Sequence, residues 1–497
     1  MEDITIMKKI LYSAFAGLLT LSSCSLDIND DPNYPSSDNI TPSLQFPAAI
    51  NSVADAVGSQ LFIYGGFFSQ YFEQMPEANQ YNDIAELNLD ESKDLFTRPY
   101  RYLYAGALQD LKDITTKTNN PADLFAVAVI RAQAFQLLVD NTSETPYTEA
   151  LQGSANPNPV YDDGKVVFEG ILKELDDAEA ALDGSVMEMS DPLFDKSVSQ
   201  WKGYANALRL RIYMKLIDGG VNVADYTAKA KALVAAGEFF TGDVKWDVYS
   251  PVEGQFNPFY GTKFELNANN FCAAYPIAAY MNETADPRIG YAMVRRTSDN
   301  TYAGQLPGAK QGNIYDAASH KNNSVSAINV EMTKDAPIYL FTQSEVQFLI
   351  AEVEYRFNNN AAAAKSAYEA AVQADFASRG VAGASDFLAA AGSWDSASDK
   401  LHLLYMQKWV AFFMRNHMEA WSEIRRNDVP ALSPYSAAQI NSAPESYTPG
   451  DLIAPDVNYY GKGNIAMRVP YSSASRSYNK NTPSAKQVSD KVFWDVK

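Results

Sequence analysis

Apolar residues recur at helical spacing along most of the chain, and this pattern constrains the fold more than any other feature. Side chains at positions i, i+3, i+4 and i+7 lie on one face of an α-helix. Residues 166–182 show the pattern most clearly, through Phe168, Ile171, Leu172, Leu175, Ala178 and Leu182. The same spacing predicts further helices at residues 101–115, 122–139, 201–217, 226–236, 344–357, 361–378 and 401–426. The sequence therefore predicts a mostly α fold with little β-structure.

One pair of predicted helices has the residue offsets of a tetratricopeptide unit. In such a unit an aromatic residue closes the first helix, and small and aromatic residues of the second helix pack against it. The matching residues are Phe348, Tyr355, Ala364, Tyr368 and Ala371, with the turn at Asn358, Asn359 and Asn360. The other helix pairs fit this repeat only loosely. We therefore expect a tetratricopeptide-like scaffold of helix pairs.

Two long regions lack helical periodicity and are rich in Gly, Pro, Asn and Tyr. They span about residues 241–342 and 431–497. Irregular stretches of this length inside a compact protein usually carry function or pack as ordered loops. We expect them to be loop-rich insertions within one helical domain that spans residues 42–497.

The N-terminus has the pattern of a lipoprotein export signal. Lys8 and Lys9 precede a short apolar run, which ends in the tetrapeptide Leu-Ser-Ser-Cys at residues 21–24. The run is too short to remain in a bilayer as a spanning helix. We expect residues 1–23 to be removed and Cys24 to carry acyl chains, of which at least two are needed for stable anchoring. An ordinary secretion signal, with Cys24 present by chance, is the alternative.

Residues 24–41 have the composition of an extended, acidic tether. Asp27, Asp30 and Asp31 lie among prolines, and no apolar periodicity follows them before Thr41. In some outer-membrane systems, acidic residues directly behind the lipidated cysteine send a lipoprotein to the cell surface. A solvated linker without such a role is the alternative.

The charge and the cysteine content exclude several classes of protein. The formal net charge is −20, whereas a nucleic-acid-binding protein needs Lys and Arg to displace counterions from phosphates. We therefore expect no nucleic acid partner. If Cys24 carries lipid, Cys272 has no partner for a disulfide within the chain, and its apolar neighbours predict a buried, inert thiol.

The chain carries no enzyme or cofactor signature. Nucleophile-elbow, zinc-protease and phosphate-loop patterns are absent from the sequence. His402 and His417 lie four turns apart on one predicted helix, too far apart to share a metal ion. A calcium-loop-like start at Asp27 has Pro32 where glycine is needed. The sequence therefore predicts a protein that is not an enzyme and that holds neither a cofactor nor a metal.

Aromatic residues supply the candidate ligand contacts. They form 12% of the chain, and a flat aromatic ring offers a large contact face to a sugar ring or a peptide side chain at little cost in entropy. Most should belong to the core, so the candidates are those in predicted loops, with one neighbouring amide. They are Phe68, Tyr71, Asn79, Tyr81, Phe96, Tyr100, Trp246, Tyr260, Tyr302 and Tyr315.

Six further motifs follow one another along nearly all of the mature chain. They are Asp140-x-x-x-Glu144-Thr145-Pro146-Tyr147-x-Glu149-Ala150, Trp201-Lys202-x-x-Ala205-Asn206-x-Leu208-Arg209-Leu210-Arg211, Asp286-Pro287-Arg288, Ser344-Glu345-Val346-x-Phe348-Leu349-x-Ala351-Glu352, Gln407-Lys408-Trp409-x-Ala411 with Trp421-x-Glu423-x-Arg425-Arg426, and Arg468-Val469-Pro470-Tyr471. With the export signal, they resemble the SusD/RagB family of cell-surface nutrient-binding lipoproteins. Two positions depart from the family pattern. Glu144 replaces a frequent glycine, and Arg476 precedes Asn479 where the family usually has glutamate.

The resemblance implies a fold, a place and a function. Such proteins lie on the outer face of the outer membrane as lids over a SusC-like TonB-dependent transporter. Their tetratricopeptide helices pack against the transporter, and their irregular loops hold an oligosaccharide or, in some members, a peptide. A glycan-binding lid and a peptide-binding lid both remain open. A surface hydrolase would need two carboxylates about 5 to 10 Å apart in a cleft.

Overall fold

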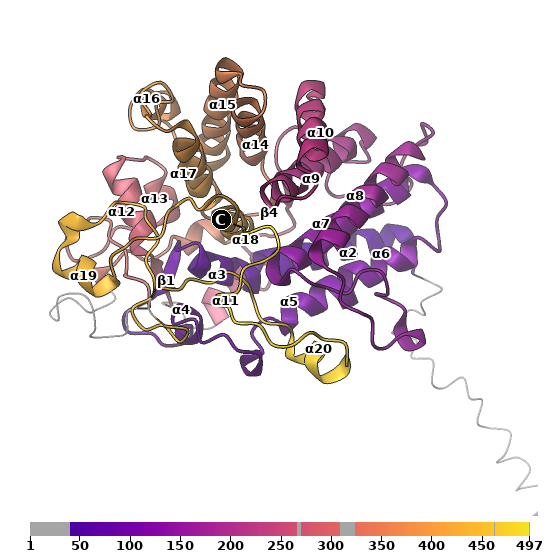
Figure 1. Ribbon diagram of the computed structural model, residues 1–497, viewed down its shortest axis with the longest axis horizontal. Coiled ribbons are helices and arrows are strands. Elements are labelled where there is room, and N and C mark those ends of the chain that lie inside the picture. Colours follow the sequence, from indigo (N-terminus) through magenta and orange to yellow (C-terminus); the bar gives the residue numbers. More distant parts are fainter. Residues whose placement is uncertain (1–39, 266–269, 309–323, 462, 497) are drawn as a thin grey trace, which may run out of the picture.

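The computed structural model describes residues 40–496, except 266–269, 309–323 and 462. Cys24, the predicted signal peptide, the predicted tether up to residue 39 and Tyr315 lie outside the described residues. The fold is mostly helical with two short antiparallel strand pairs, as the sequence predicts (Figure 1).

The first two helices are ones that the sequence analysis does not predict. They are α2 (Pro42–Gly58) and α3 (Gln60–Phe68). Proline is favoured at the first position of a helix, where its missing N–H costs nothing, and Pro42 stands there. Ile50, Val53 and Val57 follow at helical spacing and are buried. Phe68 therefore lies in a core helix and not in a loop.

The scaffold helices of the first half agree with the predicted ones. They are the continuous run of α5 (Thr97–Arg101), the π-helical η4 (Tyr102–Leu108) and α6 (Gln109–Ile114), followed by α7 (Pro121–Thr142), α8 (Gly164–Ala180), α9 (Val198–Asp218) and α10 (Val223–Ala236). Helix α7 is apolar and long enough to cross a membrane, yet 89% of its most apolar window is buried. Helix α7 therefore belongs to the core of the fold.

The predicted tetratricopeptide unit is confirmed as a packed helix pair. It consists of α14 (Gln343–Arg356) and α15 (Ala361–Arg379). The side chain of Asn360 accepts a hydrogen bond from the N–H of Ala363 and so caps α15, while Gly380 ends it in a left-handed conformation. Phe348, Ala364 and Tyr368 share one buried cluster between these helices and α17.

The prediction of one helix at residues 401–426 is wrong in one respect, because the chain forms two helices there. The structure has α17 (Lys400–Phe412) and α18 (His417–Asn427), with α16 (Ala384–Ala389) before them. Met414 takes a positive φ of 59°, and the ring Nε2 of His417 accepts a hydrogen bond from the Met414 N–H at 2.9 Å. His402 and His417 therefore lie on different helices. Within the described residues, no group of His, Cys, Asp and Glu has an arrangement that could hold a metal ion.

The two irregular regions and the segments between the first helices contain short elements that a periodicity search cannot detect. The strand pairs are β1 (Phe72–Gln74) with β3 (Phe271–Ala273) and β2 (Val244–Trp246) with β4 (Ile338–Phe341). The short helices are α4 (Asn82–Ala85), η3 (Glu91–Lys93), η5 (Gly153–Ala155), α11 (Pro258–Glu265), α12 (Tyr275–Glu283), α13 (Ile289–Ala292), η7 (Val330–Thr333), α19 (Ala437–Ser442), η8 (Pro444–Ser446) and α20 (Ser473–Tyr478). Cys272, in β3, is buried as predicted, and burial raises the pKa of its thiol.

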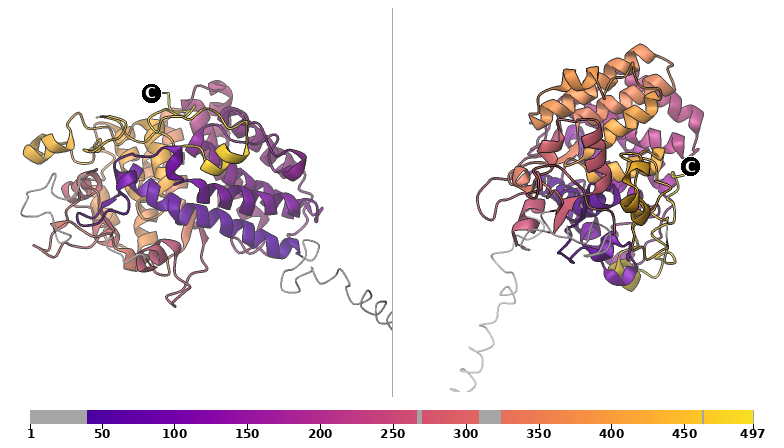
Figure 2. Two further views of the ribbon diagram at one scale, coloured as in Figure 1. Left: turned by 90° about the horizontal axis from the view of Figure 1, so that it is seen from below. Right: turned by 90° about the vertical axis from the view of Figure 1, so that its left-hand side faces the viewer.

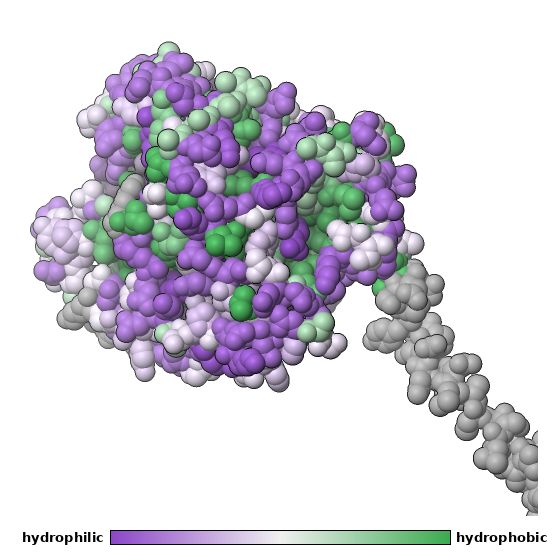
Figure 3. Space-filling model, turned by 45° about the vertical axis from the view of Figure 1, so that its right-hand side comes forward, coloured by the Kyte–Doolittle hydropathy of each residue, from purple (hydrophilic) through white to green (hydrophobic). Residues whose placement is uncertain are grey.

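Long helices and loop-rich segments occupy different sides of the molecule. In Figure 1 the scaffold from α7 to α10 and from α14 to α17 forms the upper and right-hand parts, and α4, α12, α13 and α19 lie to the left. Figure 2 shows the same separation from two other directions. On the side that carries α7 and α8, Figure 3 shows apolar atoms recessed among hydrophilic ones, without one continuous apolar patch.

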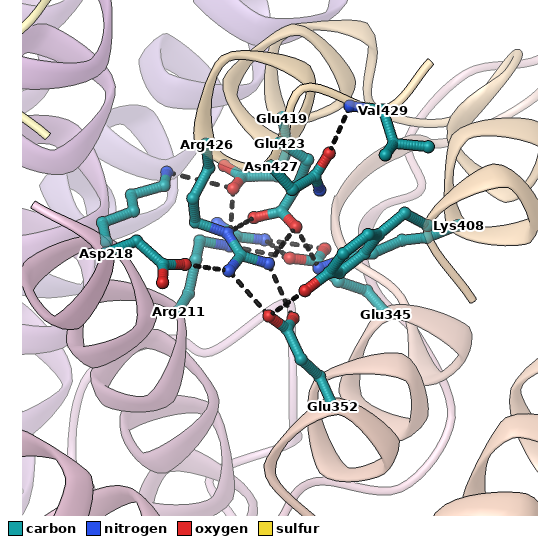
Figure 4. A network of polar contacts seen from close by, with 12 residues as sticks. Arg211, Asp218, Glu345, Glu352, Lys408, Glu419, Glu423, Arg426, Asn427 and Val429 are labelled. Atoms are coloured by element: carbon teal, nitrogen blue, oxygen red, sulfur yellow. Dashed lines mark hydrogen bonds and ion pairs between the residues drawn. The ribbon is translucent and has the colours of Figure 1, made fainter. Parts of the chain in front are cut away.

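A buried network of charged side chains joins the scaffold helices (Figure 4). Arg426 on α18 donates to both carboxylate oxygens of Glu352 on α14, at 2.8 and 2.6 Å, and also bonds Glu423. Arg211 on α9 forms a two-bond pair with Glu345, both at 2.8 Å. A charge removed from water is tolerated only when partners satisfy it. Most charged residues of the sequence motifs are thus structural, and they fix the helices relative to one another.

Candidate functional site

Six of the ten predicted ligand contacts are buried within the protein. They are Phe68, Tyr71, Tyr81, Phe96, Trp246 and Tyr260. Tyr71 illustrates the reason, because its ring stacks on Phe413 with 4.8 Å between centroids and its hydroxyl donates to the carbonyl of Trp409. In this structure these rings fill the space between helices and strands and have little free face. Their role in binding stays a prediction, one that burial disfavours.

Two other predicted contacts are accessible but stand apart. Asn79 is exposed in the loop after β1, and Tyr302 is partly exposed with the Arg295 guanidinium 4.4 Å from its ring centroid. Neither residue lines the two cavities described below. The structure therefore does not bring them together as one enclosed site.

Tyr100 lines a cleft of about 270 Å³ between the scaffold and the C-terminal region. Three further tyrosines line it with Tyr100, and together they define what we call the tyrosine cleft: Tyr100, Tyr104, Tyr161 and Tyr478. Binding pockets for compact ligands range from about 300 to 1,000 Å³. The tyrosine cleft is therefore suited to a short segment of a ligand that extends beyond it.

The first wall of the tyrosine cleft is the helical run of α5 and η4. Tyr100 and Tyr104 are one turn apart, so they share a face, and the Tyr104 hydroxyl donates to the carbonyl of Pro146 at 2.7 Å. The π-helical geometry begins between them, and such segments are frequent at functional sites. Gly106 lets η4 approach α2 closely, because an added Cβ would lie 2.6 Å from Ser52 Oγ.

The opposite wall is α20 with the segment that follows it. In Figure 1, α20 lies at the lower edge, near α5, and the Ser472 hydroxyl lies 2.8 Å from that of Thr97. Arg476 anchors the helix through two bonds to Glu91, at 2.8 and 2.7 Å. The departure from the family pattern at Arg476 thus forms an ion pair here.

The loop between α7 and α8 closes the tyrosine cleft and is tied to the second wall. The Asn479 side chain donates to the carbonyl of Pro159 at 2.8 Å. The side chain of Asn158 accepts from the Lys480 N–H at 2.9 Å, and its carbonyl accepts from Asn481 at 2.7 Å. The walls are therefore held by hydrogen bonds before any ligand arrives. Tyr478, at the end of α20, is 82% exposed and its ring is free to stack.

The chemistry of the tyrosine cleft is that of a binding site. Burial raises the pKa of the Tyr100 and Tyr104 hydroxyls, so they remain neutral. Hydroxyl and amide groups of Ser475 and Asn479 also line the cleft. Arg101 is its only charged lining residue, so the cleft lacks the pair of carboxylates that a glycoside hydrolase needs.

Sequence reasoning found Tyr100 and missed the other three tyrosines. Tyr104 could have been found, because it lies four residues after Tyr100, and one continuous helix that began a few residues before the predicted start at residue 101 would place both on one face. Tyr161 and Tyr478 carry no local signal, since they are more than 300 residues apart and meet the first wall only in the folded chain.

A larger hollow of about 750 Å³ adjoins the tyrosine cleft on the side of α6, α7 and α8. Its apolar lining includes Leu111, Leu124 and Val127, and it lies on the side of the molecule seen in Figure 3. Ala150 and Leu151 line both cavities, so one turn of chain separates them. The two form neighbouring parts of one surface.

Comparisons with known proteins agree with the fold and with the sequence motifs. A family model described as "Starch-binding associating with outer membrane" matches residues 32–447. A search of curated proteins found no significant match.

Solved structures match the chain over almost its whole length. A chitin-binding SusD homologue from Flavobacterium johnsoniae is 21% identical and has a TM-score of 0.71, over 90% of this chain and 98% of its own. A SusD homologue from Bacteroides vulgatus is 20% identical with a TM-score of 0.71, over 90% and 97%. One from Bacteroides thetaiotaomicron is 20% identical with a TM-score of 0.69, over 92% and 100%. At these identities the similarity establishes a shared fold.

Proposed function

Because the chain belongs to the SusD-like family, whose description is starch-binding and associating with the outer membrane, we propose that it binds an oligosaccharide at the cell surface. It delivers this ligand, chemically unchanged, to a partner SusC-like TonB-dependent transporter. The observation that carries the proposal is the tyrosine cleft, in which aromatic rings stand beside hydroxyl and amide groups. Rings of this kind stack on the apolar face of a sugar, while the polar groups bond its hydroxyls.

The proposal assigns different tasks to the two sides of the molecule. The scaffold helices contact the transporter, and the tyrosine cleft with the neighbouring loops holds the ligand. The tether of residues 24–41 links the domain of residues 42–497 to lipid on Cys24, with the protein facing outward. Labelling cells with radioactive palmitate tests the anchor, since wild-type protein should carry the label and the Cys24→Ser variant should not.

The alternative ligand for the same lid is a peptide. The tyrosine cleft favours an oligosaccharide over a peptide. A peptide site would offer a deep cavity with backbone-binding groups, whereas the tyrosine cleft is lined by an exposed Tyr478 and is aromatic on several sides. Two solved proteins of this fold are described as chitin-binding. We therefore place oligosaccharides first.

Titration calorimetry of the mature chain, residues 24–497 with Cys24→Ser, tests the proposal directly. Starch and chitin oligosaccharides and a panel of peptides serve as ligands. Tyr478→Ala should weaken oligosaccharide binding by about 1 to 3 kcal/mol, taking the range found for nucleobases that stack on one aromatic side chain. Tyr459→Ala is the matched control, because Tyr459 is also an exposed tyrosine, at 68%, and lies outside the cleft. Equal affinities for the two variants would refute the site, and binding of peptides alone would refute the ligand class.

A further inference from the structure

We propose that the tyrosine cleft selects an acidic sugar, one with a carboxylate or sulfate group, through the guanidinium of Arg101. The inference rests on the proposed function and narrows its ligand class. Arg101 is exposed on α5 and is the only charged residue that lines the cleft.

The guanidinium of Arg101 has no partner in the described part of the chain. Among the residues that the structure describes, the Arg101 side chain takes part in no hydrogen bond, ion pair or ring contact. Arg476 and Arg131, on other elements, are paired, with Glu91 and with Glu174 at 2.7 Å, whereas Arg98, within the described residues, is unpaired like Arg101 but lies outside the cleft. An unpaired arginine at a concave site is notable in a chain with 60 acidic and 40 basic residues.

The carboxylates near the cleft are already engaged by other groups. Asp162 accepts from the N–H groups of Tyr147 and Thr148, each at 2.9 Å. Glu149 accepts from the side chain of Asn156 at 3.0 Å and from the N–H of Val160 at 3.1 Å. These bonds hold the acids to the loop itself, and neither acid forms an ion pair with Arg101.

The helix dipole does not account for this charge. A basic residue is favoured in the last turn of a helix, where carbonyl groups are free. The α5 helix does not end at Arg101, because η4 and α6 continue it without a gap. Arg98 lies one turn earlier and is also exposed, so two like charges stand three residues apart, an arrangement that costs stability on an isolated helix. An anionic group of a ligand would reduce the repulsion between Arg98 and Arg101.

The recognition chemistry follows from the groups in place. A guanidinium forms two parallel hydrogen bonds with a carboxylate or a sulfate, and such charged pairs are stronger than neutral ones. Tyr478 would stack on the sugar ring, and the amide of Asn479 and the hydroxyl of Ser475 would meet its hydroxyls. A neutral sugar would gain the stacking without the charged pair.

Matched pairs of ligands test the inference by titration calorimetry on the mature chain with Cys24→Ser. One pair is an oligogalacturonate and its full methyl ester, and the other is a sulfated chondroitin oligosaccharide and its unsulfated form. We expect the charged member of at least one pair to bind tenfold or more tightly, with a preference that falls as salt is raised. The pair that shows the preference identifies carboxylate or sulfate as the recognised group.

Two variants test whether Arg101 is the residue responsible for the preference for the charged ligand. Arg101→Gln should abolish the preference for the charged member, whereas Arg98→Gln, which removes the same charge one turn away and outside the cleft, should keep most of it. Equal binding of charged and neutral members, or an equal loss in both variants, would overturn the inference and leave oligosaccharide binding standing. Failure to bind any sugar would overturn both proposals.

Discussion

At the scale of single residues, removing one member of a buried ion pair costs more stability than removing one member of an exposed pair. Burial alone would raise the pKa of Glu352, but Arg426 outweighs this effect and lowers the pKa to about 2. The pair is fully buried. Removing one member leaves the other charge in a medium that cannot solvate it, and such losses cost about 3 to 5 kcal/mol.

Glu352→Gln should therefore lower the free energy of unfolding by about 3 kcal/mol or more. Urea denaturation followed by circular dichroism measures it. Lys173→Ala serves as the control, because Lys173 pairs with Asp177 on the exposed side of α8, with 73% and 65% of the side chains exposed. Such a surface pair contributes less than about 1 kcal/mol. Similar losses in both variants would show that the network is not structural.

Glu73 gives the fold a dependence on pH. Its carboxylate accepts from the N–H groups of Gln74 and Gly308, at 2.8 and 3.2 Å, yet burial raises its pKa from 4.5 to about 8. Between these values the folded protein keeps a proton that the unfolded chain releases. The contribution of Glu73 to the free energy of unfolding is thus fully present below pH 4.5 and is lost as the pH rises through 8. The loss is at most about 1.4 kcal/mol per pH unit.

Glu73→Gln should remove that part of the pH dependence. We expect the variant to lose less unfolding free energy than the wild type between pH 5 and pH 8, measured by urea denaturation at both values. The difference between the two proteins cancels the other titrating groups. Parallel slopes would show that Glu73 titrates alike in the folded and unfolded chain.

At the scale of elements, cap residues determine how accurately the ends of a helix can be predicted from the sequence. Helix α15 was predicted almost to the residue, because Asn360 and Gly380 mark its ends. The break between α17 and α18 was missed, because neither glycine nor proline marks it and the left-handed residue is Met414. The π-helical geometry of η4 was also missed, since no residue within the segment marks it in the sequence.

Gly106→Ala tests whether the close contact of Gly106 with Ser52 shapes the tyrosine cleft. Alanine usually stabilises a helix by about 1 kcal/mol relative to glycine, but here the added Cβ would lie 2.6 Å from Ser52 Oγ and 2.9 Å from Ser52 Cβ. We expect a loss of about 1 to 3 kcal/mol in unfolding free energy and weaker oligosaccharide binding.

Two further variants serve as controls for Gly106→Ala. Gly261→Ala, in α11, should not destabilise, because no atom outside that helix lies within 4 Å of the added Cβ. The double variant Ser52→Gly with Gly106→Ala should recover part of the loss, since it removes the clashing side chain. Destabilisation by Gly261→Ala to the same extent would contradict the account of the contact.

At the scale of the whole molecule, the scaffold is encoded locally and the tyrosine cleft is not. Helical periodicity and the offsets of one tetratricopeptide unit predicted the fold class, because each signal lies within one helix or one helix pair. The cleft joins residue 100, the loop near residue 161 and the helix near residue 478, so only the assembled chain forms it. Six aromatic candidates proved to be core residues, because aromatic content alone does not distinguish packing from binding.

The most direct test of the central claim, capture of an oligosaccharide without chemical change, is one equilibrium experiment on the mature chain. The protein is titrated with its best-bound oligosaccharide, and the ligand is then recovered and analysed by anion-exchange chromatography. The account predicts saturable binding that Tyr478→Ala weakens, together with full recovery of intact ligand. Shorter oligosaccharides in the recovered material, or no saturable binding to any oligosaccharide, would contradict it.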